Sequence, residues 1–304
     1  MSALRRRADT YSKIRSFFRE RSVLEVETPL LARATATEPY LRSLSTRDGH
    51  YLQTSPEFAM KRLLAAGSGS IYQICKAFRE GESGARHNPE FTMLEWYRVG
   101  FSLPRLIEEV AELIRQLTGR ERVEILTYAE LFENHLGINP HTVSTQALAA
   151  MAAQRLDYQT ADEDRDTLLD LLLSHLIEPQ LGREGMTFVC EYPASQCALA
   201  RLKTTENGRV VAERFELYLE GMELANGYHE LTDPQEQQRR FASDIDARAR
   251  LGLPPVRPSE LLIGALQAGL PDCCGVALGL DRLLMVILNE PQIGSTLSFA
   301  FDRV

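Results

Sequence analysis

The sequence predicts an α+β fold in which helices flank an antiparallel sheet. Strand-like runs occur in pairs joined by short polar or glycine-containing turns, and helices with one apolar face alternate with these pairs. Strands joined by hairpins pair antiparallel, because a parallel connection needs a long crossover. The glycine- and proline-containing breaks at 182–185 and 254–258 are too short for a domain linker. We therefore expect residues 1–304 to form a single domain.

The N-terminal third alternates helices and strands. Residues 4–21 place Ile14, Phe17 and Phe18 on one helical face. Serine followed by proline at 55–56 favours a helix start, because serine caps well and proline suits the first helical position. The expected elements are a helix at 4–21, a short strand at 23–29, a helix at 55–64, and a long hairpin at 71–78 and 90–99.

The remaining two thirds predict a second antiparallel group enclosed by helices. The stretch 102–117 carries a continuous apolar stripe, and the residues at about 127–183 are also rich in helical patterns. After these, we expect strands at 186–191, 210–220 and 222–229, a polar helix at 234–251, a short strand at 276–278 and a buried helix at 279–288.

Composition excludes several classes of protein. The chain has 42 acidic and 34 basic residues, a net charge of −8, which argues against a general nucleic-acid-binding surface. Five cysteines without a CxxC spacing argue against a disulfide framework or a zinc site, and they fit a reducing cytoplasm. The N-terminus lacks the apolar core of a signal peptide, and no stretch approaches the ~20 apolar residues of a membrane span. We expect a cytoplasmic protein without a membrane partner.

The first candidate site lies in the hairpin at 71–99. Arg79, Arg86 and His87 place three possible cations on one loop and its flanking strands. Arginines that converge on one point suit phosphate oxygens, because each guanidinium offers paired donors. Phe91 offers a flat face to a purine base. The alternative is a solvated charged hairpin with Phe91 in the core.

The second candidate is a pair of carboxylates, Glu216 and Glu223. A turn at 220–221 would fold their strands together so that the two side chains could face each other. Paired carboxylates near phosphates commonly hold Mg²⁺. Asn226 and Glu230 follow at a spacing that could reach the same cleft. Spacing alone favours the alternative, an exposed strand face with alternating acids.

The third candidate is the segment 275–282, GVALGLDR. Glycines at a junction between strand and helix let a ligand approach the backbone closely. Arg282 lies in the first helical turn, where the helix dipole disfavours a cation, so a bound anion or a stacked ring is indicated. Tight packing of the helix on the sheet is an equally good explanation.

Segments 23–31, 78–97 and 275–282 resemble, in order, motifs 1, 2 and 3 of class II aminoacyl-tRNA synthetases. The strings at 86–97 and 223–230 look most like the lysyl enzymes, and the resemblance covers nearly the whole chain. It implies a class II catalytic core that uses ATP and Mg²⁺ to make an aminoacyl-adenylate, and a homodimer formed through motif 1.

The chain departs from the lysyl enzymes at several positions. No N-terminal anticodon-binding barrel is expected, because the motif 1 helix begins almost at Met1, so no direct binding of a tRNA anticodon is expected. Ala277 and Gly81 stand where those enzymes place a glycine and a glutamate, and 193–196 also differ. These features resemble the truncated lysyl-synthetase paralogues that attach (R)-β-lysine, or lysine, to elongation factor P.

The resemblance also implies a role for each matching residue. Adenine would lie between Phe91 and Arg282, Arg79 would hold the α-phosphate, and Glu80 or Glu82 would replace the glutamate missing at Gly81. A methyl group at Ala277 would favour a β-amino acid. The implied catalytic residues are Arg79 and Arg282. The implied ATP contacts are Arg79, Glu80, Gly81, Arg86, His87, Asn88, Phe91, Glu223, Leu224, Gly279 and Arg282. The implied amino-acid contacts are Ser55, Pro56, Glu57, Glu95, Tyr97, Asn226, Glu230 and Ala277, and the implied metal ligands are Glu216 and Glu223.

Two other functions remain open at this point. An adenylate-forming enzyme could transfer its product to tRNA, a carrier protein or a small molecule. A regulatory paralogue could bind the same ligands without catalysis, but it would be expected to lose Arg79, Arg282 or the Glu216 and Glu223 pair, and all four are present.

Overall fold

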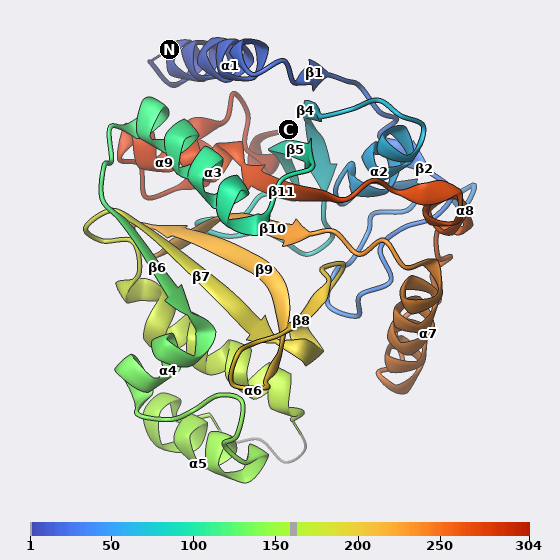
Figure 1. Ribbon diagram of the computed structural model, residues 1–304. Coiled ribbons are helices and arrows are strands. Elements are labelled where there is room, and N and C mark those ends of the chain that lie inside the picture. Colours follow the sequence, from blue (N-terminus) through green and yellow to red (C-terminus); the bar gives the residue numbers. More distant parts are fainter. Residues whose placement is uncertain (1, 159–162) are drawn as a thin grey trace. The chain divides into compact units, whose positions relative to one another are not determined.

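The computed structural model describes residues 2–158 and 163–304, which form two compact units (Figure 1). Unit 1 combines the chain up to Leu106 with Glu230–Val304, and unit 2 is the continuous segment Ile107–His229. Helix α3 (Leu103–Thr118) contains the boundary between them. Unit 1 is therefore assembled from the two ends of the chain.

Unit 1 is a small sheet with helices. Its elements are α1 (Ser2–Glu20), β1 (Leu24–Glu25), β2 (Leu31–Ala32), β3 (Tyr51–Leu52), α2 (Glu57–Ala65), β4 (Ile71–Phe78), β5 (Glu90–Val99), α7 (Pro234–Arg250), α8 (Glu260–Gly269), β11 (Cys273–Gly279) and α9 (Leu280–Leu288). The strand order is β1-β4-β5-β11, with β1 parallel to β4 and the other neighbours antiparallel.

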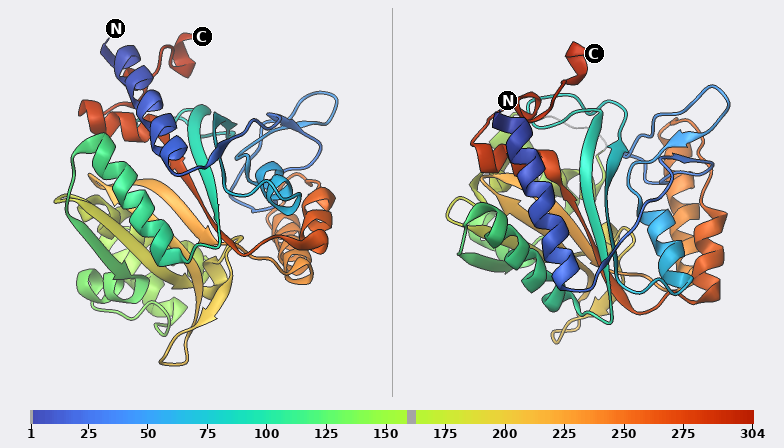
Figure 2. Two further views of the ribbon diagram at one scale, coloured as in Figure 1. Left: turned by 45° about the horizontal axis from the view of Figure 1, so that its top comes forward. Right: turned by 90° about the horizontal axis from the view of Figure 1, so that it is seen from above.

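The two faces of this sheet have different partners. Phe18 of α1 stacks on Tyr72 at a centroid distance of 4.4 Å and meets Trp96 edge-on at 5.3 Å, so α1 covers the face that carries even-numbered residues of β4 and β5 (Figure 2). Side chains alternate along a strand and directly opposed residues share a face. The register therefore gives the other face to Glu95, which lies opposite Ala277, and to Tyr97, which lies opposite Gly275.

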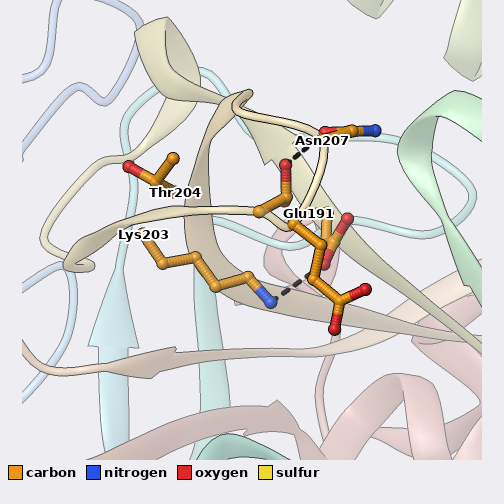
Figure 3. Close-up of a pocket in the computed structure, with 6 residues that line it drawn as sticks. Glu191, Lys203, Thr204 and Asn207 are labelled. Atoms are coloured by element: carbon orange, nitrogen blue, oxygen red, sulfur yellow. Dashed lines mark hydrogen bonds and ion pairs between the residues drawn. The ribbon is translucent and has the colours of Figure 1, made fainter.

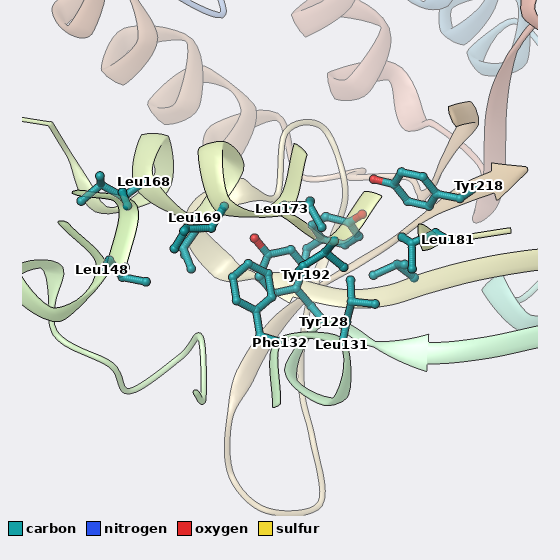
Figure 4. Packing of buried hydrophobic residues seen from close by; sticks show 14 of the residues in the cluster. Tyr128, Leu131, Phe132, Leu148, Leu168, Leu169, Leu173, Leu181, Tyr192 and Tyr218 are labelled. Atoms are coloured by element: carbon teal, nitrogen blue, oxygen red, sulfur yellow. The ribbon is translucent and has the colours of Figure 1, made fainter. Parts of the chain in front are cut away.

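Unit 2 is a second sheet packed against helices. Its elements are β6 (Val123–Thr127), α4 (Tyr128–Leu136), α5 (Thr145–Leu156), α6 (Arg165–Leu172), β7 (Met186–Pro193), β8 (Leu202–Thr204), β9 (Val210–Leu219) and β10 (Met222–His229). The strand order is β10-β9-β7-β6, and β8 pairs with β9. Tyr128 packs on Phe132 and Tyr192 at 4.7 and 4.8 Å, in a core that joins the helices to β7 (Figure 4).

The predicted α+β class is confirmed, and the two hairpins lie where the sequence predicts them. The expected strands 71–78, 90–99 and 222–229 match β4, β5 and β10 at both ends. Glu220 and Gly221 join β9 to β10 with φ of 52° and 68°, the left-handed pair of a type I′ turn. That turn fixes which residues of β9 and β10 face each other.

Other predicted bounds were wrong. The strand expected at 23–29 shrinks to β1, because only Leu24 and Glu25 pair with β4. Helix α2 begins at Glu57 with Pro56 as its N-cap, rather than with Ser55 in that role. The strand expected at 276–278 extends over Cys273–Gly279, since β5 offers seven opposed residues, and the structure adds β6 and α8.

Candidate active site

A buried lysine lies between two carboxylates in unit 1. Lys61, one turn after Glu57 on α2, places its Nζ 2.7 Å from Glu57 Oε1 and 2.6 Å from Glu230 Oε2. Lys61 and Glu230 are each only 1% exposed. Burial alone would lower the pKa of Lys61, but the Glu230 and Glu57 carboxylates raise it above its usual value. The lysine therefore stays charged and holds both acids in place.

A third carboxylate, Glu95, lies in the same unit and is bonded to two hydroxyl groups. Its Oε2 accepts a hydrogen bond from Ser55 Oγ at 2.6 Å, and its Oε1 accepts one from Tyr97 OH at 2.7 Å. Burial, together with the nearby Glu57, raises the pKa of Glu95 to about 8. Glu95 is consequently protonated in much of the protein at neutral pH.

Gly275 on β11 lies close to Tyr97 and Glu230. A Cβ at this position would overlap Tyr97 Cε1 and lie 2.5 Å from Glu230 Oε1, so no side chain fits there. Ala277, two residues along β11, lies opposite Glu95. The expected amino-acid contacts Ser55, Glu57, Glu95, Tyr97, Glu230 and Ala277 are thus carried by α2, its preceding residues, β5, β11 and the residue after β10.

Arg79 and His87, two of the predicted ATP contacts, each have a protein partner in unit 1. Arg79 Cζ lies 5.1 Å from the centre of the Phe91 ring, and its Nη1 lies 3.4 Å from Glu82 Oε1. Glu80 is exposed. Of the two candidates for the glutamate role at this turn, Glu82 is the one that contacts Arg79.

Arg282 and His87 form a second pair. Arg282 Nη2 lies 2.5 Å from His87 Nε2, and its Nε donates to the Arg86 carbonyl at 3.3 Å. Burial and the Arg282 charge lower the pKa of His87, so it is neutral at pH 7 and can accept from Arg282. Arg282 and Phe91, the expected adenine partners, have protein partners in this structure.

Two further expected ATP contacts are Asn88, whose side chain is already hydrogen-bonded to the protein, and Leu224, which could offer its backbone. Asn88 is buried, donates to the Glu90 carbonyl at 2.5 Å and accepts from Phe301 N at 3.1 Å. Leu224 is 3% exposed and lies at an irregularity of the β9–β10 ladder. An interrupted ladder leaves backbone groups available to a ligand.

Glu216 is the centre of a dense hydrogen-bond network in unit 2. Its Oε2 accepts from Tyr192 OH at 2.6 Å and from Tyr218 OH at 2.5 Å, while its Oε1 pairs with Arg214 and lies 3.4 Å from Asn226 Nδ2. The opposing Glu216 charge raises the pKa of Arg214 although burial alone would lower it. Glu216 is therefore held rigidly.

Glu223 lies opposite Tyr218, whereas Glu216 lies opposite Asn226. The two carboxylates are thus diagonal neighbours on one face of the sheet rather than directly opposed. Within the described residues, no group of three or more His, Cys, Asp or Glu side chains is arranged to hold a metal ion. Mg²⁺ commonly binds through one or two carboxylates together with substrate phosphates, which this pair fits.

Sequence reasoning missed two residues that organise these groups. From the sequence, Lys61 can be recognised only as a possible ion-pair partner of Glu57, four residues earlier on the same helix. Arg7 Nη2 on α1 lies 2.5 Å from Asp281 Oδ1, and the other Asp281 oxygen accepts from Thr92 N at 2.6 Å. Nothing in the local sequence of Arg7 indicates this pair.

A separate pocket lies beside β8 in unit 2 (Figure 3). Lys203 Nζ lies 2.9 Å from Glu191 Oε1 there. The pocket is lined by Glu191, Lys203, Thr204, Thr205, Glu206 and Asn207. None of the predicted site residues lines it, and its surroundings are a polar surface turn.

The fold agrees with the comparisons with known proteins. The family model of class II tRNA synthetases (D, K and N) matches residues 1–303, and the chain belongs to this family. Among curated proteins, it is 48% identical over 311 residues to the elongation factor P–(R)-β-lysine ligase of Salmonella gallinarum. It is 47% identical over 312 residues to the proteins of the same name from Salmonella dublin and Salmonella heidelberg. Each alignment covers 99% of this chain and 95% of the relative.

Proposed function

We propose that this protein uses ATP to activate (R)-β-lysine, or lysine, and transfers the acyl group to a lysine side chain of elongation factor P. The family and the names of the relatives support an amino-acid ligase. The observation that carries the choice of substrate is the set of acids Glu57, Glu95 and Glu230, of which Glu95 and Glu230 are buried and Glu57 is partly buried. Enclosed carboxylates need cationic partners, and a diamino acid supplies two.

In the first step, a carboxylate oxygen of the amino acid attacks the α-phosphorus of ATP. The bond between this phosphorus and the bridging oxygen breaks, and pyrophosphate leaves. Two anions must meet, so Arg79 would neutralise the α-phosphate as charge develops. His87 and Arg86 would contact the γ-phosphate. Arg282 would leave His87 to stack on adenine opposite Phe91.

Mg²⁺ would lie beside Glu216 and Glu223 when ATP is present and would neutralise phosphate charge. Glu216 already receives donors from Tyr192, Tyr218, Arg214 and Asn226, and the Asn226 contact is the longest at 3.4 Å. Asn226 is therefore the donor most readily exchanged. The other three would keep the carboxylate oriented.

In the second step, the ε-amine of the acceptor lysine attacks the acyl carbon of the adenylate. An amide bond forms, the bond from the acyl carbon to the AMP oxygen breaks, and the attacking nitrogen loses a proton. The adenylate is itself the activated acyl donor, so no nucleophile of the protein is needed. The enzyme has to position the two reactants and exclude water.

We further propose that the chain acts as one catalytic domain, as a homodimer through the segment 23–31, and in the cytoplasm. Within the described residues, no helix is both long and apolar enough to cross a membrane. The short strand β1 presents Leu24, which is 55% exposed, and Leu31 of β2 is 47% exposed. Light scattering after size exclusion tests the dimer, and a monomer at micromolar concentration would disprove it.

The decisive experiment is the intact mass of elongation factor P after incubation with this protein, ATP and Mg²⁺. (R)-β-Lysine and lysine are supplied in parallel reactions. A gain of one lysyl unit supports the ligase, and a larger yield with (R)-β-lysine supports that isomer. Formation of AMP and pyrophosphate without a mass gain would point to another acceptor, such as tRNA or a small molecule. Absence of AMP would contradict amino-acid activation altogether.

A further inference from the structure

Lys61 is unusual because it is charged, fully enclosed and paired with two acids at once. A lysine is rarely buried unless it is paired. Ion pairs at i,i+4 on an exposed helix contribute little, but the pair of Lys61 and Glu57 also includes Glu230, which is 1% exposed. Helix α8, which packs against α2, buries only apolar side chains, namely Leu262, Ile263 and Leu266.

The charges of Glu57, Glu95, Glu230 and Lys61 can be added together. Glu57, Glu95 and Glu230 supply three negative charges when all are ionised, and Lys61 supplies one positive charge. Among the described residues, no Lys, Arg or His forms an ion pair with Glu95, whose partners are the hydroxyls of Ser55 and Tyr97. The net charge is therefore −2 once Glu95 has lost its proton, which equals the number of ammonium groups on a diamino acid.

The position of Lys61 also decides where those ammonium groups can bind. Its Nζ occupies the gap between Glu57 and Glu230 at 2.7 and 2.6 Å. A second cation cannot enter the same gap. A substrate ammonium is therefore directed away from this gap, toward the carboxyl of Glu95. Gly275 leaves room for both Tyr97 and Glu230, because a Cβ there would lie 2.3 Å from Tyr97 Cε1 and 2.5 Å from Glu230 Oε1.

We infer that Lys61 is a positioning residue that determines specificity for diamino acids, because it fixes Glu57 and Glu230 and directs a substrate ammonium to Glu95. This inference rests on the proposed function, since it concerns the amino acid that the same site activates. Lys61 itself does not touch the reacting carboxylate. Its effect is exerted through the two acids that it holds.

The test is amino-acid-dependent exchange of pyrophosphate into ATP, measured for the wild type and Lys61→Met. Methionine has a similar shape without the charge. We expect KM for (R)-β-lysine or lysine to rise at least about tenfold, while KM for ATP changes less than about twofold. Without Lys61, Glu57 and Glu230 would share a proton, so the rise of kcat/KM with pH should shift to higher pH. A merely structural role would not produce this shift.

Lys76→Met is the matched control. Lys76 on β4 pairs with Glu90 at 3.2 Å, but both side chains are more than 40% exposed. Its loss should leave both KM values and the pH profile unchanged. If Lys61→Met does not fold, Lys61→Arg retains the charge, and its wider guanidinium should separate the two acids and raise KM for the amino acid.

The outcomes separate this inference from the proposed function. A folded Lys61→Met with the wild-type KM for the diamino acid would overturn the role of Lys61 and leave the ligase intact. If Lys61→Met does not fold, Lys61→Arg with the wild-type KM would do the same. If the wild type shows no exchange with any diamino acid, both the proposed function and this inference fail.

Discussion

Arg7 on α1 forms an ion pair with Asp281 at the start of α9, and the Asp281 side chain is only 2% exposed. Arg7 also donates a hydrogen bond to the Thr296 carbonyl at 2.9 Å, and Asp281 accepts one from the backbone N–H of Thr92 on β5. The pair therefore joins the N-terminal helix, the central strand and the helix that carries Arg282. It thus links the start of motif 3 to the β5 strand of motif 2.

Replacing Arg7 by Met should lower the free energy of unfolding of unit 1 by about 3 kcal/mol, because it leaves the Asp281 carboxylate buried without its cation. Trp96 is the single tryptophan and is fully buried in this unit, so its fluorescence during urea denaturation gives the measurement. The control is Arg15→Met, whose pair with Glu25 is exposed and should contribute within about 1 kcal/mol. Equal losses in both variants would contradict the prediction.

Glu216→Gln should reduce the rate of pyrophosphate exchange at least about a hundredfold, because it removes the charge expected to face the metal and phosphates. Glutamine is preferred to alanine here, since glutamine keeps an acceptor oxygen for the surrounding donors. Glu213→Gln on the same strand, whose partner is His229 at 3.2 Å, is the control and should keep most of the rate. Wild-type exchange in Glu216→Gln would disprove the metal assignment.

Affinity for the diamino acid should rise with pH because the pKa of Glu95 is about 8. Below this value, Glu95 must lose its proton before it can pair with an ammonium, so the association constant should rise up to roughly tenfold per pH unit and level off above pH 8. Calorimetry in two buffers should detect a released proton. Glu95→Gln should bind weakly without this slope, and a slope that persists in that variant would refute the assignment.

The raised pKa of Glu95 should make the folded protein less stable as the pH rises. The native state favours the protonated acid, so the contribution of Glu95 to stability is greatest below the ordinary glutamate pKa of 4.5 and is lost as the pH rises toward 8. Glu95→Gln should therefore be less sensitive than the wild type to pH over this range, as followed by the urea midpoint. Identical midpoint profiles would contradict this.

Gly275→Ala should abolish measurable amino-acid binding, because its Cβ would overlap the Tyr97 ring and the Glu230 carboxylate. Gly264→Ala on α8 is a matched control. A Cβ there meets nothing within 4 Å, and alanine at this exposed helix position should stabilise by about 1 kcal/mol. Isothermal calorimetry measures binding of the amino acid to both variants. Unaltered binding in Gly275→Ala would contradict this steric role of Gly275.

Ala277→Gly tests the choice between isomers. Ala277 lies opposite Glu95, so its methyl group reduces the space beside the acid. One methyl group is worth roughly 1–3 kcal/mol of discrimination, so the ratio of kcat/KM for (R)-β-lysine over lysine should fall at least about fivefold. Exchange kinetics with both isomers measure this ratio. An unchanged ratio would remove Ala277 from the specificity argument.

The parts of the fold that the sequence predicts well are those whose signals are local. Alternating side chains and a turn at Glu220–Gly221 are sufficient for the β9–β10 hairpin. The strand at 23–29 is overestimated, because its length depends on how much of β4 faces it. The local sequence does not show how many residues pair with a strand that is distant in the chain.

The same distinction separates the predicted site residues from the missed ones. Glu57, Glu95 and Glu230 are identifiable through short strings that resemble a family. Lys61 is not, because a lysine on a helix usually points to water, and only the distant Glu230 reveals that this one is buried. The partners of Glu216 are missed for a similar reason, since Tyr192 comes from another strand.

The division of unit 1 between the two ends of the chain affects how the protein folds during its synthesis. Strand β5 has left the ribosome long before β11, its neighbour on one edge, has been translated. At about 5–20 residues per second, this edge waits roughly ten to thirty-five seconds for its partner. Unit 2 is continuous and can fold during that interval. The nascent chain thus exposes an unpaired strand edge in its first third, where a chaperone would be most useful.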